Sequence, residues 1–200
     1  LAGGLTALEW TEATRVRATE VVEDILSGLS SGTHTRTEAA YQEQVEGIIA
    51  AEPLCDNVAV SALASHYAAI AREEGIAFSC RLAIPAEAGR VRNVDLSRIV
   101  GNMLENAIEA CRRMEYGAKH IRLNATVRGD MLVLMMDNTF DGDFEPYPDG
   151  RVVSRKRKSG VATGLSSIRA VADSYDGTAK FEAAGQVFKT SVRLDMVGMG

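Results

Sequence analysis

Cysteine and histidine are scarce in this chain of 200 residues, which contains three of each. Cys55, Cys80 and Cys111 lie far apart, and there is no Cys-x-x-Cys pair. The spacing of a structural zinc site is therefore absent, and there is no framework for disulfide bonds. We expect three reduced thiols in or near the core, because free cysteine is among the most buried residue types.

Long apolar runs and an excess of basic residues are also missing. The longest nearly uncharged apolar stretch, around residues 131–136, is far shorter than the roughly 20 residues that a bilayer span requires. The formal net charge of -5 argues against generic nucleic-acid binding, which needs a basic face, although residues 155–158 are all basic. The sequence contains no Gly-x-x-x-x-Gly-Lys-Ser/Thr loop, so a P-loop nucleotide site is excluded.

Two amphipathic helices are predicted before Pro53. Apolar residues recur at helical spacing over residues 5–29 and again over 37–51, and the stretch 30–35, rich in Ser, Gly and Thr, separates them. A pair of helices cannot bury both apolar stripes by itself. We therefore predict a dimerisation hairpin over residues 1–52 that forms a four-helix bundle with a second copy, giving a homodimer.

Helical and strand patterns alternate over residues 53–200, which we predict to be a second domain. Helices are predicted over 58–74, 95–114 and 164–175, and strands over 76–84, 120–128, 131–137, 178–182 and 187–194. Asp95 is expected to cap its helix, and Gly129-Asp130 to join two antiparallel strands. Residues 138–163 lack periodicity, as is typical of a functional lid. This order predicts an α+β fold with one mixed sheet backed by helices.

A ridge of polar side chains follows the predicted helix over residues 95–114. Asn102, Asn106, Glu109 and Arg113 are spaced by four, three and four residues, so they share one face of an otherwise apolar helix. An Asn side chain can bind a hard cation through its oxygen and donate to a phosphate through its nitrogen. The ridge is either a site for a metal-nucleotide complex or a solvated outer face.

The sequence DLSRIVGNMLENAIEAC, residues 95–111, resembles the asparagine box of the GHKL superfamily, which includes DNA gyrase, mismatch-repair ATPases, certain chaperones and bacterial histidine kinases. Residues 102–107 have the Asn-x-x-x-Asn-Ala pattern of the histidine-kinase branch, and the sequence of this segment is similar to that of peptide-pheromone sensor kinases. The resemblance implies a Bergerat-type α/β sandwich that binds ATP and Mg²⁺. Asn106 would ligate Mg²⁺ and Asn102 would face the phosphates. Gyrase-type ATPases have a water-activating Glu at the Asn102 position, so its absence favours phosphotransfer.

The segment MMDNTFDG, residues 135–142, resembles the first glycine box of this family, in which a carboxylate accepts a hydrogen bond from the adenine amino group. Asp137 is the predicted adenine-binding residue. Of the glycines that are usual in this box, only Gly142 is present. Asn138 begins an Asn-x-Phe sequence that resembles the version found in pheromone-sensor relatives. Taken by itself, the segment is a strand followed by a turn.

Residues 154–168, SRKRKSGVATGLSSI, resemble the lid and second glycine box. Gly160, Gly164 and Leu165 fit, whereas Val161 and Ala162 replace the usual His and Gly. The resemblance implies that Lys156 or Lys158 counters phosphate charge. Backbone amides at the start of the helix beginning near Gly164 would face phosphate oxygens. Phe188-Lys189-Thr190 is similar to the closing Phe/Thr signature of the family.

The phosphoacceptor histidine expected on the first helix of such kinases is absent, because residues 1–33 contain no His, and Thr14 stands near its position. Two functions stay open. The first is a histidine kinase core that passes the ATP γ-phosphate to histidine and then to a response regulator receiver domain. The second is a pseudokinase that dimerises and binds nucleotide, and a serine kinase similar to anti-sigma factors is a third option. The resemblance implies the cytoplasmic portion of a membrane-bound bacterial sensor, with the membrane reached only through segments absent from this sequence.

Overall fold

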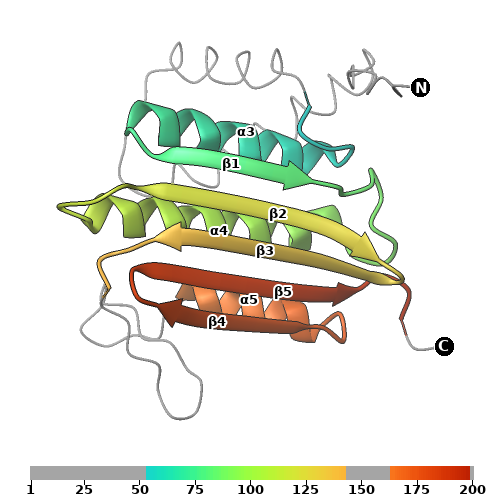
Figure 1. Cartoon of the computed structure of the whole chain (residues 1–200). Coiled ribbons are helices and arrows are strands. Elements are labelled where there is room, and N and C mark those ends of the chain that lie inside the picture. Colours follow the sequence, from blue (N-terminus) through green and yellow to red (C-terminus); the bar gives the residue numbers. More distant parts are fainter. Residues whose placement is uncertain (1–52, 143–162, 199–200) are drawn as a thin grey trace, which may run out of the picture.

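The computed structural model describes residues 53–142 and 163–198 (Figure 1). The predicted hairpin over residues 1–52 lies outside the described residues, as do Thr14, Lys156, Lys158 and Gly160. The described elements, in chain order, are α3 (Val58–Glu73), β1 (Ala77–Leu82), α4 (Asn93–Arg113), β2 (His120–Arg128), β3 (Met131–Thr139), α5 (Thr163–Asp173), β4 (Thr178–Ala184) and β5 (Val187–Asp195). None of the helices within these residues is both long and apolar enough to cross a bilayer.

The five strands form one mixed sheet in the order β1-β2-β3-β5-β4. β1 and β2 are parallel, whereas the other three neighbouring pairs are antiparallel. Helices α3, α4 and α5 lie together on one face of this sheet (Figure 1). The predicted α+β architecture, a mixed sheet backed by helices in the Bergerat manner, is therefore confirmed for the described residues. The β2-β3 hairpin turns at Gly129, whose φ of 57° suits glycine.

The hydrophobic core lies between the helices and the sheet. Every second residue of β3 is buried against the helices, namely Leu132, Leu134 and Met136. The apolar stripe of α4 covers them with eight buried residues: Leu96, Ile99, Val100, Met103, Leu104, Ala107, Ile108 and Cys111. Each large side chain buried in this way contributes about 1.5 to 3 kcal/mol to stability. The central helix is thus held firmly, and so are the polar residues it carries.

Helix α4 begins two residues earlier than predicted. Its N-cap is Arg92, which makes no capping side-chain hydrogen bond, so the prediction that Asp95 caps the helix is wrong. Asp95 lies inside the first turn and is buried, and its Oδ2 accepts a hydrogen bond from the Tyr175 hydroxyl at 2.6 Å. A partner 80 residues away therefore determines the role of this carboxylate.

Strand β3 continues two residues beyond its predicted end at Asp137. Asn138 pairs with Ile121 of β2 and Phe188 of β5, and Thr139 pairs with Val187. The Thr139 hydroxyl also accepts a hydrogen bond from the His120 backbone N–H at 3.0 Å. Asn138 and Thr139 therefore belong to the sheet, and not to the predicted lid, most of which lies outside the described residues.

Candidate functional site

The structure gives the two predicted asparagines of α4 different environments. Asn102 donates from Nδ2 to the Arg98 carbonyl oxygen at 2.7 Å, which fixes its amide and leaves Oδ1 available. The Nδ2 of Asn106 is buried and has no hydrogen-bond partner among the described residues. Buried polar atoms are normally paired, and leaving one unpaired costs about 1 to 3 kcal/mol. The unpartnered amide therefore marks Asn106 as a candidate for binding something that the described residues do not supply.

The start of α5 lies directly against these two asparagines. A Cβ placed on Gly164 would be 2.9 Å from Asn106 Nδ2 and 3.2 Å from Asn102 Oδ1. No side chain fits there without displacing the amides, which explains glycine at this position. The first backbone N–H groups of a helix lack partners within the helix, and the helix dipole favours anions at this end. The structure therefore brings Asn102, Asn106 and Gly164 together, while Leu165 packs against the core beside them.

The base-recognition prediction does not agree with the register of β3. Asp137 pairs with Arg122 and Lys189, two exposed residues on the sheet face opposite the helices. Its neighbour Asn138 points the other way, toward the helices, and is only 2% exposed. Because successive side chains of a strand alternate between faces, Asp137 and Asn138 cannot both face the site. Asn138 lies on the helix side of the sheet, and Asp137 belongs to a row of alternating charges on the outer face.

The amide of Asn138 has a fixed orientation. Its Nδ2 donates to the Thr139 carbonyl oxygen at 3.0 Å, and a flipped amide would place two oxygens against each other. Sγ of Cys111 lies 3.4 Å from the same carbonyl oxygen, so Asn138 lies near the C-terminal half of α4. Five residues of helix, about 7.5 Å, separate Cys111 from Asn106. The two halves of the candidate site are thus neighbours along α4.

Three phenylalanines form a cluster around Phe188, the residue that pairs with Asn138. Phe188 is the cross-strand partner of Asn138, and its ring contacts Phe140 edge-on with centroids 6.1 Å apart. Phe181 stacks on Phe188 at 6.5 Å. Flat apolar surfaces of this kind suit an aromatic base. Phe188 and Phe140 were predicted only as parts of family patterns. Phe181 was not predicted, although strand alternation in β4 could have placed it.

The far end of the polar ridge has a different character. Arg113 is half exposed, and its Nε lies 3.3 Å from Asp141 Oδ2, directly after β3. Gly142, with φ of 85°, follows in an exposed position. The ridge is therefore a solvated face at Arg113 and a partly buried one at Asn106, so each of the two alternatives describes one part of it.

A magnesium ion is compatible with these residues, provided that a nucleotide contributes ligands. In the parts of the chain that the structure describes, no three His, Cys, Asp or Glu side chains come together to hold a metal. Mg²⁺ commonly uses only one or two protein oxygens together with water and phosphate oxygens. The oxygens of Asn106 and Asn102 meet that requirement, because Asn106 is not fixed by any described partner and can turn its oxygen toward a cation.

Comparison with known proteins identifies the family of this chain. The family model described as the GHKL domain matches residues 91–195. The fold is similar to that of the Acinetobacter baumannii histidine kinase AdeS, with a TM-score of 0.54, 13% identity, and coverage of 92% of this chain and 98% of that chain. The histidine kinase domain of the Erythrobacter litoralis EL346 blue-light activated histidine kinase gives a TM-score of 0.52 at 14% identity, covering 92% and 93%.

The catalytic domain of histidine kinase ThkA is also similar, with a TM-score of 0.53 at 15% identity, and the match covers 70% of this chain and 92% of that chain. No curated protein sequence matches the chain. At these identities the solved structures establish the fold, whereas the family rests on the matched model.

Proposed function

This chain belongs to the GHKL domain family, and we propose that it is the ATP-binding core of a two-component sensor histidine kinase. In this proposal residues 53–200 bind ATP with Mg²⁺ and transfer the γ-phosphate to a histidine, for relay to a response regulator. Residues 1–52 form the dimerisation hairpin of a homodimer. The observation that carries the proposal is the buried, unpartnered Nδ2 of Asn106 beneath the first turn of α5.

The phosphate half of the proposed site consists of Asn102, Asn106 and the start of α5 at Gly164. Asn106 would hold Mg²⁺ through its amide oxygen, with the free Oδ1 of Asn102 beside it. Mg²⁺ held there would supply positive charge to neutralise the phosphate oxygens. Backbone N–H groups of the first turn of α5 bind the phosphates, and Lys156 or Lys158 adds positive charge.

The base half of the proposed site uses Asn138 in place of Asp137. With Nδ2 held by Thr139, the Oδ1 of Asn138 is available to accept a hydrogen bond from the exocyclic amine of adenine. Guanine has a carbonyl oxygen at that position, and two acceptors facing each other leave buried polar groups unpaired. The fixed amide therefore favours ATP over GTP.

A nucleotide-binding dimerisation module without phosphotransfer is the second candidate. The observation that favours it is the absence of any His from residues 1–33, with Thr14 near the expected phosphoacceptor position. In favour of the kinase, residue 102 is Asn and so offers no carboxylate to remove a proton from water, as an efficient hydrolase would need.

Titration calorimetry with Mg²⁺ and ATP tests the phosphate half. The wild-type chain should bind ATP more tightly with Mg²⁺ than with a chelator present, and Asn106→Ala should remove this difference. Asn124→Ala, which changes the same residue type on the outer face of β2, is the matched control and should bind like the wild type. An Asn106→Ala chain with wild-type affinity would remove the central assignment.

Competition between ATP and GTP tests the base half. Asn138→Ala should reduce the affinity for ATP by roughly 10- to 100-fold, the equivalent of one buried hydrogen bond, and narrow the preference over GTP. Asp137→Asn should leave both affinities unchanged, since that side chain lies on the opposite face. The reverse outcome would restore Asp137 as the adenine-binding residue.

Incubation with γ-labelled ATP separates the two candidate functions. The kinase predicts phosphate on the chain, or on a supplied histidine-bearing hairpin, that is labile in acid and stable in alkali. The binding module predicts ATP binding without any such label. Acid-stable phosphate that disappears in Thr14→Ala would instead indicate transfer to a hydroxyl group.

A further inference from the structure

The C-terminal end of α5 is attached to the N-terminal end of α4 by a buried hydrogen bond. The Tyr175 hydroxyl donates to Asp95 Oδ2 at 2.6 Å, and both residues are buried. The same hydroxyl accepts from the Arg92 backbone N–H at 3.2 Å, while the Arg92 side chain donates to Asp95 Oδ2 at 2.8 Å. Three residues of one closed network thus join the two helices.

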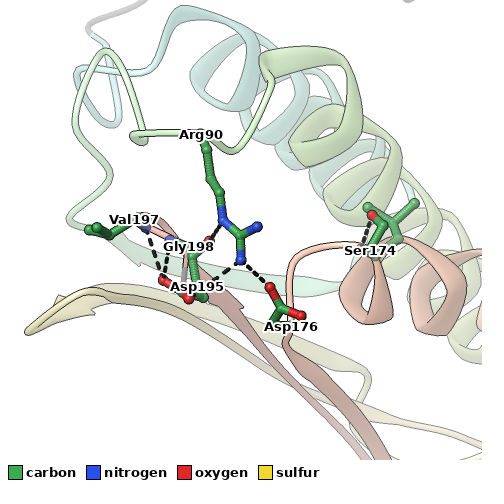
Figure 2. Close-up of polar contacts among 7 residues, drawn as sticks. Arg90, Ser174, Asp176, Asp195, Val197 and Gly198 are labelled. Atoms are coloured by element: carbon green, nitrogen blue, oxygen red, sulfur yellow. Dashed lines mark hydrogen bonds and ion pairs between the residues drawn. The ribbon is translucent and has the colours of Figure 1, made fainter. Parts of the chain in front are cut away.

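The backbone around Tyr175 is held in place by β5 and by Arg90. The Asp195 backbone N–H donates to the Tyr175 carbonyl oxygen at 3.0 Å. The Arg90 guanidinium lies 5.9 Å from the centroid of the Tyr175 ring. Arg90 also donates from Nε to the Asp195 carbonyl oxygen and pairs with Asp176 at 2.6 Å (Figure 2). The position of the tyrosine is therefore set by three separate parts of the chain.

The spacing along the two helices connects this network to the candidate nucleotide site. Eleven residues separate Asp95 from Asn106 on α4, and eleven separate Gly164 from Tyr175 along α5 and its following turn. The contacts Asp95-Tyr175 and Asn106-Gly164 show that the helices run antiparallel. Eleven helical residues span about 16 Å. A shift of α5 at the tyrosine end would therefore move Gly164 along α4 by a similar distance.

We propose that Asp95 and Tyr175 are positioning residues for the phosphate half of the nucleotide site. Their hydrogen bond fixes how far α5 extends along α4, and so places the first backbone amides of α5 over Asn106. Neither residue touches the ligand. The inference rests on the proposed nucleotide site, but it makes a separate claim, namely that the site depends on a contact about 16 Å away.

The base half of the site supplies the internal comparison. Asn138 is carried by β3, whose place in the sheet does not depend on α5. A loss of positioning should therefore weaken the binding of ligands that carry a triphosphate and leave the binding of adenosine, which has none, unchanged. General destabilisation of the domain would weaken the binding of both ligands alike.

Tyr175→Phe, which removes one oxygen and keeps the ring, is the direct test. The dissociation constant of ATP with Mg²⁺ should rise by roughly 10- to 100-fold, the scale expected when a binding group is misplaced by about 1 Å. The dissociation constant of adenosine, measured by ligand-observed NMR, should change less than about twofold, far below the tenfold step that one hydrogen bond gives. An equal loss for both ligands, or no loss for ATP, would overturn the proposal.

Two further variants sharpen the result. Ser61 lies on α3, remote from α5, and its buried hydroxyl accepts a hydrogen bond from the Leu54 backbone N–H. Ser61→Ala removes this hydroxyl and should leave ATP binding unchanged. The double variant Asp95→Asn with Tyr175→Phe should lose no more ATP affinity than the more affected single variant, because both remove the same contact. Additive losses would contradict a shared positioning role.

The backbone amide resonance of Gly164 gives a readout without any ligand. It should move in Tyr175→Phe and stay in place in Ser61→Ala, and an unmoved resonance in Tyr175→Phe would contradict the positioning claim. If the wild-type chain failed to bind ATP while the resonance moved as expected, the proposed function would fail and the coupling between the two ends of α5 would stand.

Discussion

The two ends of α5 contact the same helix but differ in how their polar groups are satisfied. At the Tyr175 end, the hydroxyl, the Asp95 carboxylate and the Arg92 guanidinium are all hydrogen-bonded to one another or to backbone. At the Gly164 end, the Nδ2 of Asn106 is buried and has no partner in the part of the chain that the structure describes. The satisfied end stabilises the fold, and the unsatisfied end retains binding capacity. A domain can keep an unpaired group in place only where neighbouring contacts hold it there.

Two glycines, Gly164 in the first turn of α5 and Gly177 beyond its C-terminal end, give the largest expected contrast. A Cβ at Gly177 would overlap the Arg193 carbonyl oxygen of β5, so Gly177→Ala should lower the free energy of unfolding by roughly 1 to 3 kcal/mol or more. A Cβ at Gly164 meets only the ends of two Asn side chains, which can move. Gly164→Ala should keep its stability and lose about 100-fold in ATP affinity, because the amides are displaced.

Urea denaturation and calorimetry on both variants would check this contrast. The comparison would break if Gly164→Ala unfolded as easily as Gly177→Ala, since the start of α5 would then be as structural as its end.

Removal of one polar side chain at each end should change stability in opposite ways. Asn106→Ala removes an unpaired amide, so the free energy of unfolding should stay the same or rise by up to about 1 kcal/mol. Asp95→Ala leaves the Tyr175 hydroxyl and Arg92 without their carboxylate partner, and should lower the free energy of unfolding by about 1.5 to 3 kcal/mol. Equal losses in the two variants, measured by urea denaturation, would mean that Asn106 has a structural partner after all.

The pH dependence of stability should identify the Asp95 network. Burial by itself raises the pKa of Asp95, but the hydrogen bonds from Tyr175 and Arg92 outweigh it, so the pKa lies below its ordinary value. A carboxyl group with a lowered pKa in the folded state contributes stability above its unfolded pKa of about 3.9, and loses it as pH falls through the folded pKa.

The difference in unfolding free energy between wild type and Asp95→Asn should therefore be constant from about pH 7 to pH 5 and shrink below about pH 4. Carboxyl groups common to both chains cancel in this difference. Asn106→Ala, compared with wild type in the same way, should show no such narrowing. A wild-type advantage that grows on acidification would contradict the network as described.

The smallest effect is expected from an ion pair that belongs to neither end of α5. Arg112 of α4 pairs with Glu74 after α3, and the arginine side chain is 54% exposed. Exposed pairs contribute about 0.2 to 1 kcal/mol and are screened by salt. Glu74→Gln should reduce stability by no more than that at low salt, with no loss at high salt and unchanged ATP affinity. A larger loss would show that exposed pairs matter as much here as the buried Asp95 contact.

The type and chain order of the described elements could be predicted from the sequence because local patterns determine them. The α4 stripe from Leu96 to Cys111 and the alternation of β3 both follow the hydrophobic period, and Gly129 marks the hairpin turn. Helix ends were less accurate. Asp95 has the right residue type for a cap, but its partner is Tyr175, and no local rule detects a contact 80 residues away.

The candidate site was predicted in part. Asn102, Asn106 and Gly164 were named from the sequence, and the structure brings them together. Asp137 was chosen because of its charge and its place in a family pattern, although the alternation Leu132, Leu134, Met136 already points to Asn138 as the next residue facing the helices. The signal was present, and chemical type was given more weight than strand periodicity.

The alternation of β3 links the proposed base recognition to the packing of the hydrophobic core. The residues Leu132, Leu134 and Met136 fill the core in the same phase as Asn138. An insertion or deletion of one residue between Met136 and Asn138 would put the apolar row and the proposed recognition residue on opposite faces of the sheet. Replacement of Asn138 can thus alter the chemistry at this position, whereas a shift by one residue would either turn the position away from the helices or expose the apolar row.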